Sequence, residues 1–109
     1  MPGAIAEADW KVLRRVHLLA LERYCERVLA EIESVAHNSA QSTHQRYLDI
    51  FKIVEQRDRE IASIFNDLKR SNALRMLARI RSFGLLTENE FSALSPETRS
   101  AIKLLLGAG

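Results

Sequence analysis

Glycine and proline are scarce in this chain of 109 residues, which has four glycines and two prolines. None of them lies between Ala4 and Phe83. Proline ends or kinks a helix and glycine weakens one, so their absence leaves a long stretch that can form long helices. A fold rich in strands would need turn residues at short intervals. The sequence therefore predicts an all-α fold.

Cysteines and long apolar runs are also lacking. Cys25 is the single cysteine, which excludes an internal disulfide framework. The apolar run Leu18 to Leu21 is far shorter than the roughly 20 residues that span a bilayer. The N-terminus has neither the basic start nor the apolar stretch of a signal peptide. We expect a cytoplasmic protein that does not enter a membrane.

Catalytic and cofactor-binding motifs are absent as well. The sequence has no glycine-rich phosphate loop, Cys-x-x-Cys pair, His-Glu-x-x-His or Gly-x-Ser-x-Gly. The nearest approach to a metal site is Glu33 with His37, beside His44, and these are better explained as helix-end side chains in water. We therefore predict no enzymatic activity and no cofactor.

The chain does contain a long apolar stripe with helical spacing. Its members are separated by 4, 3, 7, 4 and 3 residues: Tyr47, Phe51, Val54, Ile61, Phe65 and Leu68. A second stripe of the same kind precedes it: Leu18, Leu21, Cys25, Val28, Ile32 and Val35. Both are narrow and sustained, as in a coiled-coil seam.

A small polar segment, residues 37–43, separates the two stripes and is the best candidate for a turn. Asp9 is a candidate cap for the first helix. We expect a single domain over 1–109 with an antiparallel hairpin over about 9–69, and a continuous bent helix is the alternative. The expected core residues are Leu21, Val28, Ile32, Phe51, Val54, Ile61, Phe65 and Leu68.

The last third of the chain contains several residues that typically start or end short helices. Near Asn72 the apolar residues begin a new helical stripe that is out of phase with the preceding one, which predicts a separate helix. Gly84 can end that helix in a left-handed conformation. Thr87 to Glu90 forms a capping box, and Ser95 precedes a proline suited to the first turn of another helix. Two or three short helices are therefore expected over about 71–106.

Residues 74–106 resemble the short C-terminal helical domains that end many bacterial proteins. The resemblance rests on a leucine-rich helix, the turn GLLTENEF and a closing helix. The chain departs from that pattern by inserting Ser95 and Pro96. The resemblance implies a role in assembly and no catalytic role.

The two stripes hold more apolar surface than one hairpin can bury between its own helices. We expect the C-terminal helices, a second copy, or both to cover the remainder, and predict a homodimeric helical bundle. The corresponding function is a non-enzymatic interaction or assembly protein that acts through homo-oligomerisation and a surface for an unidentified protein partner.

Basic residues cluster between the hairpin and the tail, although the net charge of the chain is only +2. No acidic residue occurs between Asp67 and Glu88. An alternative function is therefore nucleic-acid binding through phosphate contacts. The segment lacks interleaved aromatic residues, so this alternative is not favoured. The candidate residues for binding nucleic acid or a protein partner are Lys69, Arg70, Arg75, Arg79 and Arg81.

The sequence also predicts the burial or contacts of four individual residues. Cys25 is expected to be a small core residue, and His17 a partly buried, hydrogen-bonded one. Asp58 interrupts the second stripe and Asn72 would extend it. Both residues are either exposed or specify register within a seam, and Asp58 can also pair with an arginine of another helix.

Overall fold

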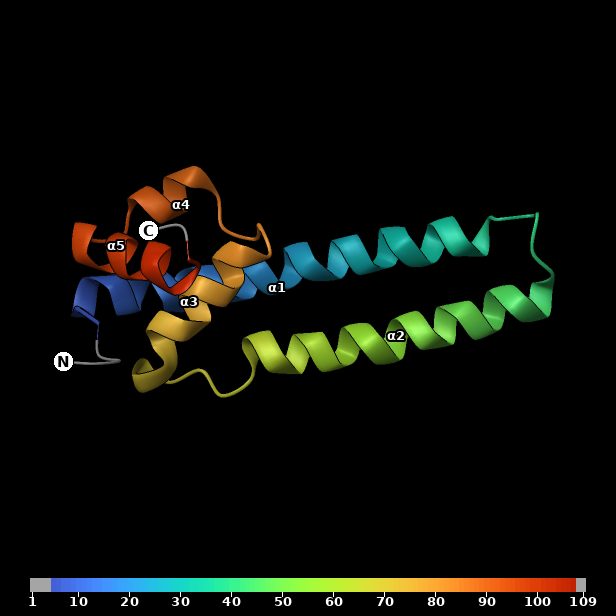
Figure 1. The fold of residues 1–109 in the computed structure, drawn as a ribbon, viewed down its shortest axis with the longest axis horizontal. Helices are drawn as coiled ribbons and strands as arrows, with labels where there is room; N and C mark the ends of the chain where they lie inside the picture. The colour runs from blue at the N-terminus through green and yellow to red at the C-terminus, as the bar shows by residue number, and fades with distance from the viewer. Residues whose placement is uncertain (1–4, 108–109) are drawn as a thin grey trace.

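The computed structural model describes residues 5–107, and its secondary structure is helical throughout (Figure 1). Within those residues no strand occurs, which confirms the predicted all-α fold. The elements are α1 (Glu7–Ala36), α2 (Thr43–Phe65), a short 3-10 helix η1 (Arg70–Asn72), α3 (Ala73–Ser82), α4 (Glu88–Ser92) and α5 (Pro96–Leu105).

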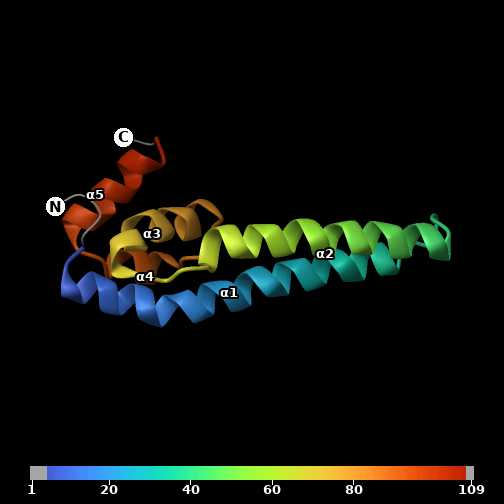
Figure 2. The same ribbon diagram turned by 90° about the horizontal axis from the view of Figure 1, so that it is seen from below.

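Helices α1 and α2 form the predicted antiparallel hairpin (Figures 1 and 2). The turn lies where the polar segment indicated. Ser42 caps α2 by accepting a hydrogen bond from the backbone N–H of Gln45 at 3.0 Å. The hairpin is longer than the rest of the fold, so the molecule is elongated, with extents of 54 × 25 × 24 Å. The loop end of the hairpin projects beyond the other helices.

The short C-terminal helices begin and end at the capping and stop residues that the sequence indicated. Gly84 has a φ of 68°, and the N–H of Leu85 bonds to the carbonyl of Ile80, which completes a left-handed stop after α3. Thr87 and Glu90 form a reciprocal capping box on α4. Ser95 caps α5, with Pro96 in its first turn.

The start of α1 differs from the expectation. The helix begins at Glu7, so Asp9 lies inside the first turn and is not a cap. Its side chain is 1% exposed and accepts three hydrogen bonds, from the backbone N–H and hydroxyl of Ser95 and from the hydroxyl of Thr98. Asp9 therefore joins the first helix to the start of the last one.

The end of α2 also differs. The helix stops at Phe65, before the expected boundary near Lys69. Asp67 then adopts a positive φ of 66°, and Asn72 donates a side-chain hydrogen bond to its carbonyl oxygen. This tight turn sends α3 back along the base of the hairpin and leaves Leu68 37% exposed, outside the core.

The core lies at one end of the molecule, where α3, α4 and α5 pack on the first half of α1 and the end of α2 (Figure 1). Its fully buried members come mostly from residues outside the two predicted stripes: Leu13, Val16, Ile64, Leu77, Ile80, Leu85 and Ile102.

The predicted core is therefore only partly correct. Phe65 is buried, and Leu21, Val28 and Ile61 are half-buried against the core. Ile32 is half-buried on the hairpin. Phe51, Val54 and Leu68 were wrongly assigned, since they are 54%, 47% and 37% exposed. The C-terminal helices cover the base of the hairpin and leave Phe51 and Val54, farther along α2, exposed.

Among residues 5–107, no helix combines the length and the apolar character that crossing a bilayer requires.

Candidate functional site

Three of the five basic residues that are candidates for binding nucleic acid or a partner form ion pairs within the fold. Arg70 donates to Glu7 at 2.6 Å and to the carbonyl of Ile5 at 2.9 Å. Lys69 pairs with Asp67 at 3.3 Å. Both cations therefore serve contacts within the fold.

Arg81 is also engaged inside the fold. It pairs with Glu88 at 2.9 Å, and its guanidinium lies 3.9 Å from the ring centroid of Phe91. Three of the five candidates thus have acidic partners, and the continuous basic surface that the sequence indicated is broken up.

Arg75 and Arg79 remain together, one helical turn apart on the exposed side of α3. Neither forms an ion pair with an acidic residue of 5–107. Both line a pocket of about 200 Å³ between the end of α2 and the start of α3. Ser63, Asn66 and Asn72 supply the other polar groups of this lining, and sequence reasoning did not connect them with it.

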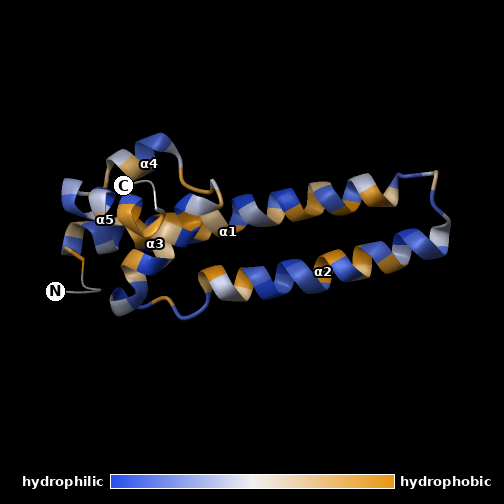
Figure 3. Ribbon diagram, in the orientation of Figure 1, coloured by the Kyte–Doolittle hydropathy of each residue, from blue (hydrophilic) through white to orange (hydrophobic). Residues whose placement is uncertain are grey.

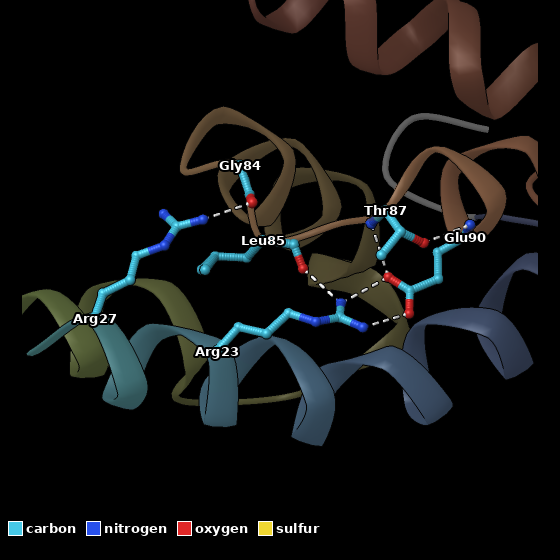
Figure 4. Close-up of polar contacts among 6 residues, drawn as sticks. All are labelled: Arg23, Arg27, Gly84, Leu85, Thr87 and Glu90. Carbon is cyan, nitrogen blue, oxygen red and sulfur yellow. Dashed lines mark hydrogen bonds and ion pairs between the residues drawn. The ribbon is translucent and has the colours of Figure 1, made fainter. Parts of the chain in front are cut away.

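Two arginines of α1 hold the loop between α3 and α4 (Figure 4). Arg23 donates to both carboxylate oxygens of Glu90, at 2.7 and 2.9 Å, and to the carbonyl of Leu85 at 2.8 Å. Arg27 donates to the carbonyls of Phe83 and Gly84. The hydrogen bond from Arg23 is the main reason that the pKa of Glu90 falls to about 2. These contacts fix the tail on the hairpin.

A second polar network joins the two hairpin helices. Tyr24 donates its hydroxyl to Glu60, and Arg57 bonds to Glu60 and to Glu31, each at 3.0 Å. Burial, followed by the hydrogen bond with Glu60, raises the pKa of Tyr24 to about 12. The network places charged groups inside the α1–α2 contact, where apolar residues would be expected.

Apolar side chains line one side of the hairpin. Leu18 and Leu29 on α1 are 66% and 64% exposed. On α2, Tyr47, Phe51 and Val54 are 65%, 54% and 47% exposed. Apolar residues recur along both hairpin helices in Figure 3. We call these five residues the hairpin flank.

The contacts between the helices place the α1 members of the flank on the side away from the C-terminal helices. Leu18 and Leu29 each follow a residue directed toward α2, namely His17 and Val28. Arg27, which precedes Val28 by one residue and so lies on the opposite side of the helix from Leu29, binds the α3–α4 loop. One residue is about 100° of helical turn. Leu18 and Leu29 therefore point away from that loop.

The α2 members lie on the same side. Tyr47 follows Arg46, which bonds to the Ala36 carbonyl of α1, and Val54 follows the half-buried Ile53. Ser63, on the opposite side of the contact face, bonds to Arg79 of α3. In an antiparallel pair of right-handed helices, the residue that follows a contact residue lies on the same side of the pair in both helices. The five residues of the flank therefore lie on the same side of both helices, with the exposed Asp58 also on that side.

The remaining candidate residues have ordinary surroundings. His17 donates from Nε2 to the carbonyl of Phe65 at 3.0 Å and is half-buried, as predicted. Cys25 is half-buried. Asp58 is exposed and Asn72 half-buried. Within residues 5–107, no three His, Cys, Asp or Glu side chains gather closely enough to hold a metal ion.

Searches against protein-family models, curated proteins and solved structures give no match to this chain. The two surface features that bear on function are the hairpin flank and the pocket beside α3.

Proposed function

We propose that the protein is a non-enzymatic assembly protein that forms a homodimer through the hairpin flank. The observation that carries the proposal is the alignment of five large, exposed apolar side chains on one side of the hairpin. Isolated exposed apolar residues are normal on protein surfaces, but several large ones gathered on one side of a hairpin are typical of an interaction site.

The size of the surface supports a stable contact between two copies. Helix α2 has 23 residues and is therefore about 35 Å long. Two helices about 10 Å apart present a face about 20 Å wide, or about 700 Å². A stable interface buries about 800 Å² on each partner.

A second copy is the occupant that this surface suits best. A two-fold axis brings the same surface patch of both copies together, so an apolar flank meets an equally apolar one. Two hairpins packed in this way form a four-helix bundle, with the C-terminal helices on its outer sides. Because the dimer has two-fold symmetry, it would present each surface for a further partner twice.

Light scattering across a concentration series tests the proposal. The expected mass is about 25 kDa, twice the 12.4 kDa of one chain. Replacing two flank residues, Leu29→Glu with Phe51→Glu, should reduce the mass to that of the monomer, because burying unpaired carboxylates at the interface is costly. Helix content by circular dichroism should stay unchanged, since both side chains are exposed in the monomer.

Leu104→Glu is the matched control. Leu104 is 70% exposed, close to the 64% of Leu29, but it lies on α5, outside the flank. The control should remain dimeric. A wild-type mass that stays at 12.4 kDa at every concentration would refute the proposal. Equal dissociation of the Leu104→Glu and flank variants would also refute it.

A further inference from the structure

The pocket beside α3 has a lining suited to an anion. Its polar groups are the guanidiniums of Arg75 and Arg79, the amides of Asn66 and Asn72 and the hydroxyl of Ser63. No carboxylate lines it. Two positive charges and three neutral polar groups therefore converge on one small space.

Contacts inside the pocket hold both guanidiniums in place. Arg79 donates to the hydroxyl of Ser63 at 2.9 Å, and its guanidinium lies 5.7 Å from the ring centroid of Phe83. Arg75 donates to the side-chain oxygen of Asn72 at 3.3 Å. A guanidinium has five N–H donors, and each of these hydrogen bonds uses one of them. Most of the donors are therefore available to a ligand.

The neighbouring acidic residues already have partners. Asp67 pairs with Lys69 and accepts a hydrogen bond from Asn72. Glu60 accepts hydrogen bonds from Tyr24 and Arg57. Neither Arg75 nor Arg79 forms an ion pair with an acidic residue of 5–107, although Arg79 interacts electrostatically with Glu60 at longer range.

We propose that this pocket binds a phosphate group. The planar guanidinium fork matches the oxygens of phosphate, and two arginines match the charge of a dianion. The volume of about 200 Å³ lies below the range of about 300–1,000 Å³ that encloses larger ligands. The occupant is therefore a phosphate with a small substituent, or one phosphate of a nucleic-acid backbone. This inference does not depend on dimerisation.

Calorimetric titration with inorganic phosphate at low ionic strength tests the site. The test variant is Arg75→Ala with Arg79→Ala, and the control is Arg14→Ala with Arg15→Ala. The control removes the same charge from two exposed residues of α1. The dissociation constant should rise at least about tenfold for each pocket arginine removed, since each provides charge-assisted hydrogen bonds. The control should bind as the wild type does.

The lysine variant, Arg75→Lys with Arg79→Lys, keeps the charge and removes the fork. It should bind phosphate more weakly than the wild type and more tightly than the alanine variant. It also keeps the test decisive if the alanine variant loses its helix content. Absence of phosphate binding by the wild type, or equal binding by the pocket variant and the control, would overturn the proposal.

Titration with a nucleoside monophosphate and with a short single-stranded oligonucleotide separates the two sources of phosphate. Tighter binding of the monophosphate, lost in the pocket variant, assigns a small ligand. Tighter, salt-sensitive binding of the oligonucleotide, also lost in the pocket variant, assigns a nucleic-acid backbone. Oligonucleotide binding that survives in the pocket variant while no phosphate binds would contradict the site.

Discussion

Removal of the Asp9 carboxylate should destabilise the fold more than removal of any exposed acidic side chain. Asp9 is 1% exposed and accepts hydrogen bonds of 2.8, 2.7 and 2.6 Å from Ser95 and Thr98. Asp9→Ala would leave one backbone N–H and two hydroxyls without this acceptor. We expect a loss of about 3–5 kcal/mol, because breaking a buried charged network leaves its other members unsatisfied.

Urea unfolding followed by circular dichroism measures this loss. The control is Asp58→Ala, which removes the same group from an exposed position of α2. Its effect should stay within about 0.5 kcal/mol, as for most surface substitutions. A loss below about 1 kcal/mol for Asp9→Ala, or equal losses for the two variants, would show that the Asp9 network contributes little.

The pH dependence gives a second test of the same network. Burial raises the pKa of Asp9, but the hydrogen bonds from Thr98 and Ser95 lower it more, so the net pKa lies below its ordinary value. The folded state therefore favours the ionised form. This stabilisation is complete above the unfolded pKa of about 3.9 and disappears as the pH falls through the folded pKa. The stability difference between wild type and Asp9→Ala should shrink below about pH 4.

Three further substitutions test the core and the contact between Arg23 and Glu90 that holds the tail on the hairpin. Leu77→Ala, at a fully buried position, should cost about 2–5 kcal/mol in urea unfolding, whereas Phe51→Ala should cost less than about 1 kcal/mol under monomeric conditions. Similar losses would contradict the position of the core. Glu90→Gln should cost about 1–3 kcal/mol at neutral pH. Because the pKa of Glu90 is lowered to about 2, the wild type should lose this stabilisation as the pH falls from about 4 toward 2, and the variant should not.

Local features of the chain were predictable because local chemistry determines them. Gly84 adopts the left-handed stop, and Thr87 and Glu90 form the capping box. Each of these involves residues within a few positions of one another. No tertiary contact is needed to specify them.

The face of α2 that packs on α1 was not predictable from the apolar pattern. Its contacts include Arg57, which forms ion pairs with Glu31 and Glu60, and Glu60 also accepts a hydrogen bond from the hydroxyl of Tyr24. Hydrophobic periodicity cannot detect a contact face that contains paired charges. It therefore selected the neighbouring stripe, displaced by one residue, which contains Phe51 and Val54.

The sequence indicated two of the residues that line the pocket beside α3 but not the pocket itself. The charge run contains Arg75 and Arg79, and it also includes three residues that form ion pairs within the fold. Ser63 belongs to a different helix and reaches Arg79 only because the turn after Phe65 folds α3 back beside α2. No spacing in the sequence encodes that approach.

The wrong part of the core prediction bears on the proposed dimer. Phe51 and Val54 continue the same helical line as Ile61 and Phe65, which pack on the core. The end of this stripe at Ile61 and Phe65 is covered within the chain, whereas the end at Phe51 and Val54, beyond the exposed Asp58, is not. Positions where consistent sequence patterns disagree with a monomeric structure are often functional ones. The exposed half of the stripe is therefore an argument for the hairpin flank as an interface.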